Sequence, residues 1–351
     1  KLIFIIFLFY IKMNATFNKR IIQPLSQFSK ICGLSWSPNN MKLAVANADK
    51  KIYLFDEQGI NKDNFSTKAF KSEKYEIIQI LFNPESTELA VAQSDNIINI
   101  YNIGLNWEEQ KLIINEFELE AKPNCMIWSK ISTKEIYIGL SNGDIRTCLL
   151  DKNNTSNLLY RHSLCCISIS LSFDGKYIIS GHRDCTIFIY NIEKNEVKKL
   201  VKHSCIPTCL AFGIYSSILV AGNDFKVVIY NDTGEIIQSF DYSNNDNIKD
   251  FSCCAMNNSA DAIALGNSNS FFIYSYKEGS NKWKDTIVKI ENYFVISSIC
   301  WKPDKSALVI GNLINSVDIY DIYLKKIIKK DIYEIIYYNK NFIRFTNIKI
   351  K

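Results

Sequence analysis

The sequence predicts an all-β fold, a seven-bladed β-propeller, and three observations support this prediction. A pattern of three short apolar runs recurs seven times along the chain. The copies follow one another at 41 to 46 residues, which is a nearly constant period. At 351 residues the chain also exceeds the size at which one hydrophobic core keeps growing, so it must add core by repetition or by a second domain. Repetition at this period is typical of propellers.

The composition is that of a folded globular protein. Apolar residues make up 47% and charged residues 22% of the chain, which excludes a disordered or fibrous protein. Glycine (13) and proline (6) are scarce for this length, whereas asparagine is abundant. We therefore expect asparagine to occupy turn positions that require left-handed backbone.

The first twelve residues form an apolar leader. Its run of ten apolar residues, 2–11, is too short to span a bilayer, which takes roughly 20 residues. The leader does not begin with Met, and no small-x-small cleavage site follows it. We expect residues 1–12 to be a spurious or disordered extension and residues 13–323 to form the propeller.

Each repeat predicts three β-strands, because its runs of five or six residues are rich in Ile, Val and Tyr and are separated by Asn, Asp, Ser or Gly. The first run ends in a large apolar anchor, the second in a small residue, and the third in an aromatic residue or a substitute. The anchors are Trp36, Phe82, Trp128, Leu171, Phe212, Met256 and Trp301. A more variable fourth run, such as 64–70, completes a four-stranded unit, which is the size of one propeller blade.

Four repeats carry an acidic residue between their second and third strands. These turn acids are Asp49, Asp95, Asp184 and Asp224. We expect each carboxylate to accept backbone N–H bonds in its tight turn. The repeats resemble the WD-repeat family, because Tyr-Asn, Tyr-Asp and Phe-Asp stand where that family has Trp-Asp, and His162 and His203 stand near the position of its Gly-His.

No motif in the sequence carries catalytic chemistry. The Gly-rich phosphate loop, the dinucleotide fingerprint, the nucleophile elbow and the zinc-protease motif are all missing. Asp174, Asp184 and Asp224 are better explained as turn residues than as converging catalytic carboxylates. A hydrolase with a cryptic site in the central channel would need acids or histidines on the innermost strands, and the first three of these strands have none. We therefore expect a non-enzyme without a cofactor.

The eleven cysteines are predicted to be free thiols. Their number is odd, no C-x-x-C pair occurs, and many lie in apolar runs, as Cys165, Cys253 and Cys300 do. Free cysteine behaves in this way as a small core residue in a reducing compartment. With three histidines and no paired ligand spacing, the sequence predicts neither a disulfide nor a metal site.

Two tryptophans lie outside the anchor positions. Trp107 and Trp283 fall in stretches that the repeat pattern assigns to long loops between blades. Each is either an exposed partner-binding anchor, since tryptophan is enriched at binding hot spots, or a side chain packed beneath its loop.

The C-terminal residues 324–351 belong to none of the seven repeats. Their apolar runs 332–338 and 342–345 predict strands that either complete the last blade or begin a second propeller. The aromatic residues of these strands would be poorly soluble if exposed, so they are candidate partner-binding residues. They are Tyr337, Tyr338, Phe342 and Phe345.

The net charge of +5 resides in this C-terminal segment. Residues 325–351 hold eight Lys or Arg against two acids, which leaves the rest of the chain nearly neutral. A basic tail on a neutral body does not predict nucleic-acid binding, which requires a continuous basic surface. The same lysines favour weak contact with an anionic membrane surface, worth about 1 kcal/mol per Lys or Arg.

Several stretches resemble one family of propeller proteins. Residues 56–68, 84–107, 200–207 and 237–243 are similar, in order, to the N-terminal propeller of the intraflagellar transport protein 172 family. Members of this family are peripheral subunits of ciliary transport complex B, and two propellers precede their long helical solenoid. Loop sequences such as F-S-T-K and F-D-Y-S are the better markers of this family, because blade packing does not require them.

The resemblance implies a non-catalytic protein-protein interaction scaffold that acts in cilium assembly and ciliary cargo transport. The implied partners are other complex B subunits, with no nucleic acid and no small-molecule substrate. The implied location is the cilium and the cytoplasm at the ciliary base. An alternative is a vesicle-coat or sister transport subunit with the same propeller-then-solenoid plan, and co-purification with ciliary or Golgi proteins distinguishes the two.

Overall fold

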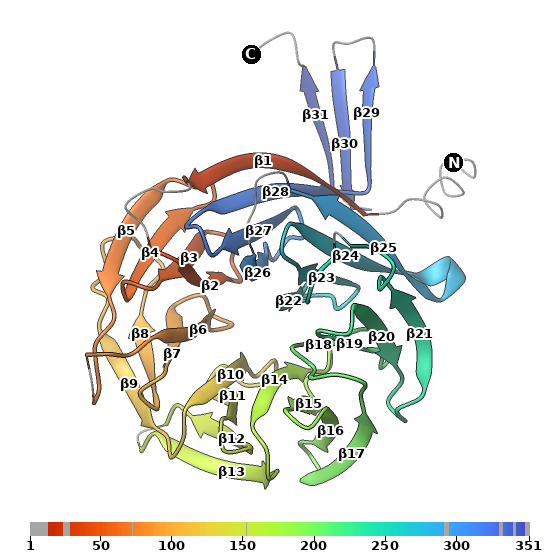
Figure 1. Ribbon diagram of the computed structural model, residues 1–351. Coiled ribbons are helices and arrows are strands. Elements are labelled where there is room, and N and C mark those ends of the chain that lie inside the picture. The colour runs from red at the N-terminus through yellow and green to blue at the C-terminus, as the bar shows by residue number, and fades with distance from the viewer. Residues whose placement is uncertain are drawn as a thin grey trace.

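The computed structural model forms a ring of seven four-stranded antiparallel sheets, with a further three-stranded sheet at the C-terminal end (Figure 1). It describes residues 13–23, 29–71, 73–151, 153–246, 248–290, 295–329, 333–339 and 342–347. The ring confirms the predicted all-β, seven-bladed propeller. The expected spurious or disordered extension, residues 1–12, lies outside the described residues.

Helical structure is almost absent from the described part of the chain. It consists of one short 3₁₀ turn, η1 (Glu278–Ser280), which precedes an outer strand. Across the described ranges, no helix has the length and apolar character that crossing a membrane requires.

The blades place their strands in sequence order from the centre of the ring outward, and each predicted anchor ends the innermost strand of its blade. The strands of blades one to three are β2 (Ile31–Trp36), β3 (Lys42–Asn47), β4 (Lys51–Asp56), β5 (Asn61–Ser66), β6 (Ile77–Phe82), β7 (Glu88–Gln93), β8 (Ile97–Asn102), β9 (Ile113–Glu118), β10 (Pro123–Trp128), β11 (Glu135–Leu140), β12 (Asp144–Leu149) and β13 (Thr155–Arg161). Those of blades four to six are β14 (Cys166–Leu171), β15 (Tyr177–His182), β16 (Thr186–Asn191), β17 (Glu196–Lys202), β18 (Cys209–Phe212), β19 (Ile218–Ala221), β20 (Lys226–Tyr230), β21 (Ile236–Asp241), β22 (Cys253–Met256), β23 (Ala262–Gly266), β24 (Ser270–Lys277) and β25 (Lys282–Lys289). Blade seven contains β26 (Ile296–Trp301), β27 (Ala307–Asn312), β28 (Val317–Tyr323) and, from the start of the chain, β1 (Asn14–Ile22).

Burial falls from the inner strands to the outer strand of a blade. Every residue of β3 and of β27 is buried, because neighbouring blades cover both faces of these strands, and their sequences read as largely apolar runs. The outer strand faces solvent, and no residue of β5 or β21 is fully buried. This exposure explains why the fourth run varies among the repeats.

Left-handed backbone recurs in the turn between the second and third strands. The residues in this conformation are Lys50, Asn96, Gly143, Cys185, Phe225 and Asn315, with φ between 58° and 93°. Asparagine fills two of these positions and six of the fourteen non-glycine positions with positive φ among the described residues, which agrees with the predicted use of asparagine in left-handed turns. The hairpin imposes the conformation on other residue types through its closing bond, as in the 3.1 Å bond from the Lys50 N–H to the Asn47 carbonyl.

The anchors pack between blades, which makes each blade depend on its neighbour. Trp301 is 6% exposed and lies in a cluster with Leu308 of its own blade and Phe271 of the preceding blade. Its Nε1 donates a hydrogen bond to the carbonyl oxygen of Ala255, 3.0 Å away in that preceding blade. The anchor therefore joins two sheets through apolar contact and through one directed bond.

The ring closes between the N-terminal strand and the seventh blade. β1 pairs antiparallel with β28, so the seventh blade runs β1-β28-β27-β26 (Figure 1). The outer strand of the last blade thus comes from the N-terminal segment and not from residues 324–351. The reason is that β1 covers the free edge of β28 from Val317 to Tyr323, which leaves no edge for a C-terminal strand.

A buried ion pair fixes the closing strand. Arg20 of β1 donates through Nε (2.6 Å) and Nη2 (2.9 Å) to the two carboxylate oxygens of Asp318 on β28. The Asp318 carboxylate is fully buried, whereas the Arg20 side chain is 29% exposed. Blade three repeats this arrangement with Arg161 and Asp144, at 2.5 and 2.9 Å. There the hydrogen bond from Arg161 lowers the pKa of the Asp144 carboxyl, so this carboxylate stays charged.

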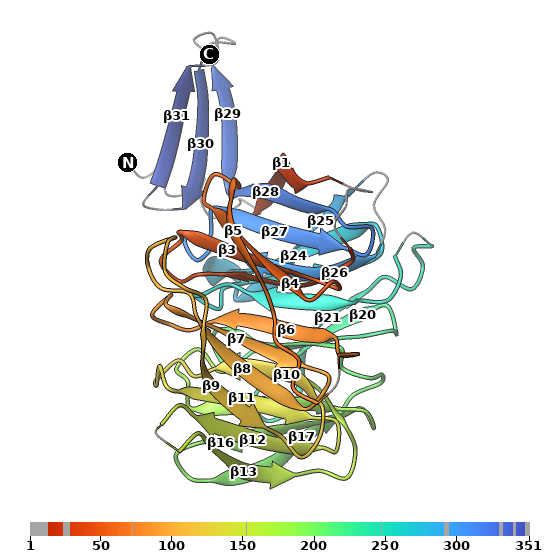
Figure 2. The same cartoon turned by 90° about the vertical axis from the view of Figure 1, so that its left-hand side faces the viewer.

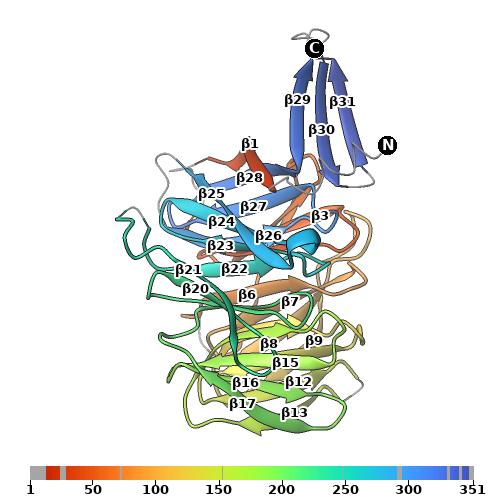
Figure 3. The same cartoon turned by 90° about the vertical axis from the view of Figure 1, so that its right-hand side faces the viewer.

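The C-terminal strands β29 (Lys325–Lys329), β30 (Tyr333–Asn339) and β31 (Phe342–Asn347) form a sheet of their own. The sheet projects from the ring beside β28 (Figure 2, Figure 3), and Arg344 lies 3.7 Å from Asp321 of β28. The start of a second propeller at this sheet stays a prediction. The candidate partner-binding residues of this segment are Tyr337, Tyr338, Phe342 and Phe345. Their side chains lie outside the described part of the structure, so their role also stays a prediction.

Replacement of Trp301 by alanine should destabilise the whole ring. The change removes contacts between blades and leaves a cavity, at a cost of roughly 3 to 5 kcal/mol in the free energy of unfolding. Urea unfolding followed by circular dichroism measures this loss. The control is Ile236→Ala, because Ile236 is 63% exposed on β21, and it should change the free energy by less than about 0.5 kcal/mol. Equal losses in the two variants would contradict the anchor assignment.

Arg20→Ala should open the closing strand. The substitution leaves the buried Asp318 carboxylate without its partner, which costs roughly 3 kcal/mol. Hydrogen exchange measured by mass spectrometry should show faster exchange in β1 and β28 than in β14, across the ring. The control is Asn18→Ala, since exposed Asn18 of the same strand bonds to Asp321 at 2.8 Å, and it should leave exchange nearly unchanged. Wild-type protection of β1 in Arg20→Ala would show that the pair does not hold the closure.

Candidate functional site

The propeller has two faces that carry different connections. Because the strands of a blade are antiparallel, the turns that join strands one to two and three to four lie on one face, which we call the hairpin face. The turns that join strands two to three lie on the opposite face with the links between blades, and we call this the crossover face. Loops on such faces are the usual binding surfaces of a rigid scaffold.

Exposed apolar side chains gather on the hairpin face. Seven large apolar residues in or beside its turns are between 54% and 70% exposed. They are Met41, Ile60, Leu105, Leu112, Ile131, Phe173 and Tyr215. Among the described residues, the loops of the crossover face carry two, Phe70 (38%) and Leu164 (44%). Contiguous exposed apolar surface marks interaction sites, so the hairpin face is the candidate protein-binding surface.

Ile131, Phe173 and Tyr215 stand at the same turn of three consecutive blades, and we call them the apolar arc. The first two belong to one patch that crosses a blade boundary. Gly175 lets Ile131 approach the next turn, since a Cβ there would lie 2.8 Å from Cγ1 of Ile131. Lys130 Nζ lies 5.6 Å from the centre of the Phe173 ring. The arc therefore presents apolar surface on adjoining turns.

Hydrogen bonds between turns hold the hairpin face together. The backbone N–H of Asn39 donates to Oγ of Ser86 in the next blade, at 3.0 Å. The N–H of Asp304 donates to Oδ1 of Asn40 across the ring closure, also at 3.0 Å. Bonds of this kind join neighbouring blades at their turns, so the face offers a preformed surface that loses little entropy on binding.

Trp107 lies on the hairpin face in a loop that is tied to blade one. The buried Nζ of Lys42 donates to the carbonyl oxygens of Gly104 (2.8 Å) and Asn106 (3.1 Å). The same Nζ lies 4.8 Å from the centre of the Trp107 ring, and burial lowers the pKa of Lys42 to about 8. Trp107 itself is half-buried against the core between blades one and two, and its role in partner binding stays a prediction.

Trp283 is a core residue, so the interpretation of its surroundings as a loop is wrong. It lies in β25, is 3% exposed, and its ring centre is 5.5 Å from that of Tyr276. The repeat pattern missed this strand because β24 and β25 are longer than their counterparts and pair as far as Lys277 and Lys282. A buried side chain at this position is unavailable to a partner.

Two of the four turn acids accept the backbone bond that the sequence predicts. Oδ1 of Asp184 accepts the N–H of Thr186 at 3.1 Å. Oδ1 of Asp224 accepts the N–H of Lys226 at 3.3 Å. Both bonds stabilise the tight turn between the second and third strands.

The other two turn acids have different partners. Asp95 accepts the N–H of Phe70, in the link that precedes its blade, at 3.0 Å. In the turn of Asp49 the side chain of Asn47 takes the expected role, because its Oδ1 accepts the N–H of Lys51 at 3.1 Å. An acid in this turn therefore accepts a hydrogen bond either from within the turn or from the link that precedes the blade.

Blade four contains a polar network around His162, His182 and the turn acid Asp184. Nε2 of His162, in the link before this blade, lies 3.2 Å from Oδ2 of Asp184. His182 is fully buried, with Nε2 2.8 Å from Oγ of Ser180 and Nδ1 3.0 Å from the carbonyl oxygen of Leu164. Burial lowers the pKa of His182, so this imidazole is neutral at pH 7. The network ties the link to the blade that follows it.

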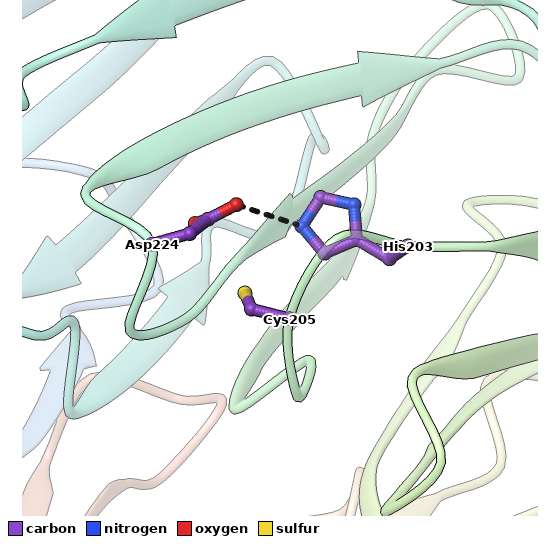
Figure 4. Close-up of side chains that lie close together, drawn as sticks. All are labelled: His203, Cys205 and Asp224. Carbon is purple, nitrogen blue, oxygen red and sulfur yellow. Dashed lines mark ion pairs between the residues drawn. The ribbon is translucent and has the colours of Figure 1, made fainter.

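Blade five carries the equivalent pair with a cysteine beside it (Figure 4). Nε2 of His203 lies 4.0 Å from Oδ2 of Asp224, and its Nδ1 lies 2.8 Å from the hydroxyl oxygen of Tyr230. Candidate ligand atoms of His203, Asp224 and Cys205 all lie within 4.8 Å of one another. Burial lowers the pKa of His203 and raises that of Cys205 to about 12, so both side chains are uncharged near neutral pH.

The sequence reasoning missed both the apolar arc and the cluster in blade five. The arc had a usable signal, because Ile131, Phe173 and Tyr215 stand in turns where Asn, Asp, Ser or Gly is usual. In the cluster, the repeat pattern indicates His203 and Asp224 but not Cys205, which lies nineteen residues before Asp224 and is brought beside it by the fold of blade five.

Comparison with known proteins agrees with the fold. The family described as "WD domain, G-beta repeat" matches residues 21–56 and 154–191. A chain from a solved structure described as "Crystal Structure of Mitotic Checkpoint Complex" superposes with a TM-score of 0.73. The superposition covers 89% of this chain and 93% of that one, at 16% identity, which shows a shared fold alone.

The curated relatives are more specific. Intraflagellar transport protein 172 of Chlamydomonas reinhardtii is 37% identical over 96% of this chain and 20% of its own length. The Homo sapiens homolog is 31% identical over 93% of this chain and 19% of its own length. The present chain thus spans about a fifth of the length of these relatives. The alignments confirm the resemblance inferred from the loop sequences, and this chain is a homologue of the N-terminal WD-repeat region of intraflagellar transport protein 172.

Proposed function

We propose that this chain is part of a protein-binding scaffold of the intraflagellar transport machinery, acting in cilium assembly and ciliary cargo transport. Its proposed partners are other subunits of transport complex B, and its proposed location is the cilium and the cytoplasm at the ciliary base. The observation that carries the proposal is the 37% and 31% identity to intraflagellar transport protein 172 over 96% and 93% of the chain.

The hairpin face is the proposed binding surface. Its apolar arc exposes Phe173 to 54% and Tyr215 to 70%, and aromatic side chains are enriched among binding hot spots. The turns beneath the arc belong to a ring of blades whose strands are paired and whose anchors are buried. A partner that covers the arc therefore gains apolar burial without first having to order the propeller.

The proposed function requires binding and no chemical step. The turn acids of the crossover face serve turn and link bonds, and the buried histidines of blades four and five bond within their own networks. Neither nucleic acid nor a small-molecule substrate belongs to the proposal. The basic C-terminal segment keeps its predicted weak contact with an anionic membrane surface.

Charged substitutions in the apolar arc should release the partners. We expect Ile131→Asp combined with Phe173→Asp, placed in the full-length protein in ciliated cells, to lower co-purification of other intraflagellar transport proteins by at least about tenfold. The reason is that loss of a hot-spot residue costs about 2 kcal/mol or more. Quantitative mass spectrometry of the purified complexes measures the change.

The matched control places the same charges on the rim. Ile236→Asp combined with Ile237→Asp changes two residues of β21 that are 63% and 53% exposed, and it should leave co-purification unchanged. Thermal unfolding of both variants confirms that each retains the propeller. Normal co-purification with the arc variant would exclude the hairpin face, and a wild-type protein that brings down no transport protein would refute the scaffold function.

A further inference from the structure

We propose that His203, Cys205 and Asp224 form a zinc-binding site on the crossover face of blade five. The three residues offer an imidazole nitrogen, a sulfur and a carboxylate oxygen, which is a donor set that Zn²⁺ accepts. Their candidate ligand atoms lie within 4.8 Å of one another (Figure 4). The proposed scaffold function does not use this cluster, so the two proposals stand or fall separately.

The distances fit a tetrahedral zinc centre after a small contraction. Zinc bonds of about 2.0 to 2.3 Å place neighbouring ligand atoms roughly 3.3 to 3.8 Å apart. Nε2 of His203 and Oδ2 of Asp224 are 4.0 Å apart and all three ligand atoms lie within 4.8 Å of one another, so closure by at most about 1.5 Å is required across the cluster. Three protein ligands leave a fourth position for water, and the 18% exposure of the Asp224 side chain opens the site to solvent.

His203 is already oriented as a metal ligand. The residue is 4% exposed, and its Nε2 has no hydrogen-bond partner among the described residues. Its Nδ1 lies 2.8 Å from the Tyr230 hydroxyl oxygen, and the tautomer that donates from Nδ1 leaves the Nε2 lone pair directed toward Asp224. Histidines that bind metals almost always donate their other ring N–H to an acceptor, usually a carboxylate, a backbone carbonyl or water, and the Tyr230 hydroxyl takes that place here. A bound cation would satisfy a nitrogen that is otherwise buried without a partner.

Cys205 is held beside this histidine by close packing. The residue is 7% exposed, and a Cβ at position 222 would lie 2.6 Å from its Sγ, so Gly222 makes room for the thiol. Burial and the nearby Asp224 raise the pKa of this thiol to about 12 when no cation is present. Zinc binds the thiolate, so binding breaks the S–H bond and releases its proton to water as the S–Zn bond forms.

Blade four provides an internal comparison. His162 and Asp184 occupy the equivalent positions and lie 3.2 Å apart, but Leu164 stands where blade five has Cys205. Blade four therefore closes its network with a hydrogen bond alone. The added sulfur in blade five is what turns a structural His-Asp pair into a set of three ligands.

Metal titrations of the purified chain under reducing conditions test the site. One equivalent of Zn²⁺ should bind, and Co²⁺ should produce a sulfur-to-cobalt charge-transfer band that added zinc removes. Cys205→Ser should abolish the band and weaken zinc binding by more than about 100-fold. Tyr230→Phe keeps all three ligands but removes the oxygen that positions His203, and it should weaken zinc binding by about 10- to 100-fold.

The controls lie in blade four. Asp184→Asn and Cys165→Ser should leave the band and the zinc affinity unchanged. Thermal unfolding without metal confirms that every variant folds, and zinc should raise the melting temperature of the wild-type chain but not of Cys205→Ser. A wild-type chain without the cobalt band, or a band that persists in Cys205→Ser, would overturn the proposed site.

Discussion

Closure of the ring is the constraint on which the rest of the structure depends. Each blade buries its faces only against its neighbours, so an open ring would expose two apolar sheet faces at once. The closing contact joins Arg20 and Asp318, which are 298 positions apart in the sequence. Because the Asp318 carboxylate is fully buried, a shifted register of β1 would leave a charge without a partner, and such a charge is strongly destabilising. The ion pair therefore selects the register of closure as well as holding it.

The repeated part of the fold could be predicted because packing between blades imposes a period. An anchor such as Trp36 or Trp301 must fill the same space in each repeat, so its spacing survives although the residue type changes. The closing strand could not be predicted in this way. An outer strand carries no anchor, as Phe17 of β1 shows with its 55% exposure, and the partner strand lies at the far end of the propeller sequence. The surroundings of Trp283 were wrongly predicted to be a loop for a related reason. The hairpin of β24 and β25 is longer than the outer hairpins of the other blades, so Trp283 does not follow the spacing of the repeat.

The polar sites were less predictable than the strands because they depend on how a link meets a turn. His162 and His203 lack the glycine that precedes the histidine in typical WD repeats, yet both reach the turn acid of the following blade. Topology brings the link and the turn together on the crossover face, and the His-to-Asp spacing is nearly the same in the two blades, 22 residues from His162 to Asp184 and 21 from His203 to Asp224. Cys205 has no counterpart in blade four, where Leu164 stands at the equivalent position, so no repeated motif indicates the third proposed ligand.

The distribution of exposed apolar residues follows from the contacts that stabilise the loops of each face. An exposed apolar side chain on a mobile loop favours aggregation, whereas the same side chain on a fixed turn presents a defined surface. On the hairpin face, the turn of Ile131 is joined to the next blade by the bond from Lys130 Nζ to the Ser172 carbonyl oxygen, at 3.2 Å. The turn of Tyr215 is joined to the next blade by the bond from the Ile214 N–H to the Ala260 carbonyl oxygen, at 2.9 Å, so both turns tolerate an apolar side chain at high exposure. The crossover face is held instead by polar contacts between links and turns, and its loops carry fewer exposed apolar residues in the described part of the chain. The two faces of one ring therefore differ in character: the hairpin face carries the exposed apolar residues that are proposed to bind partners, and the crossover face carries polar contacts between the links and the turns.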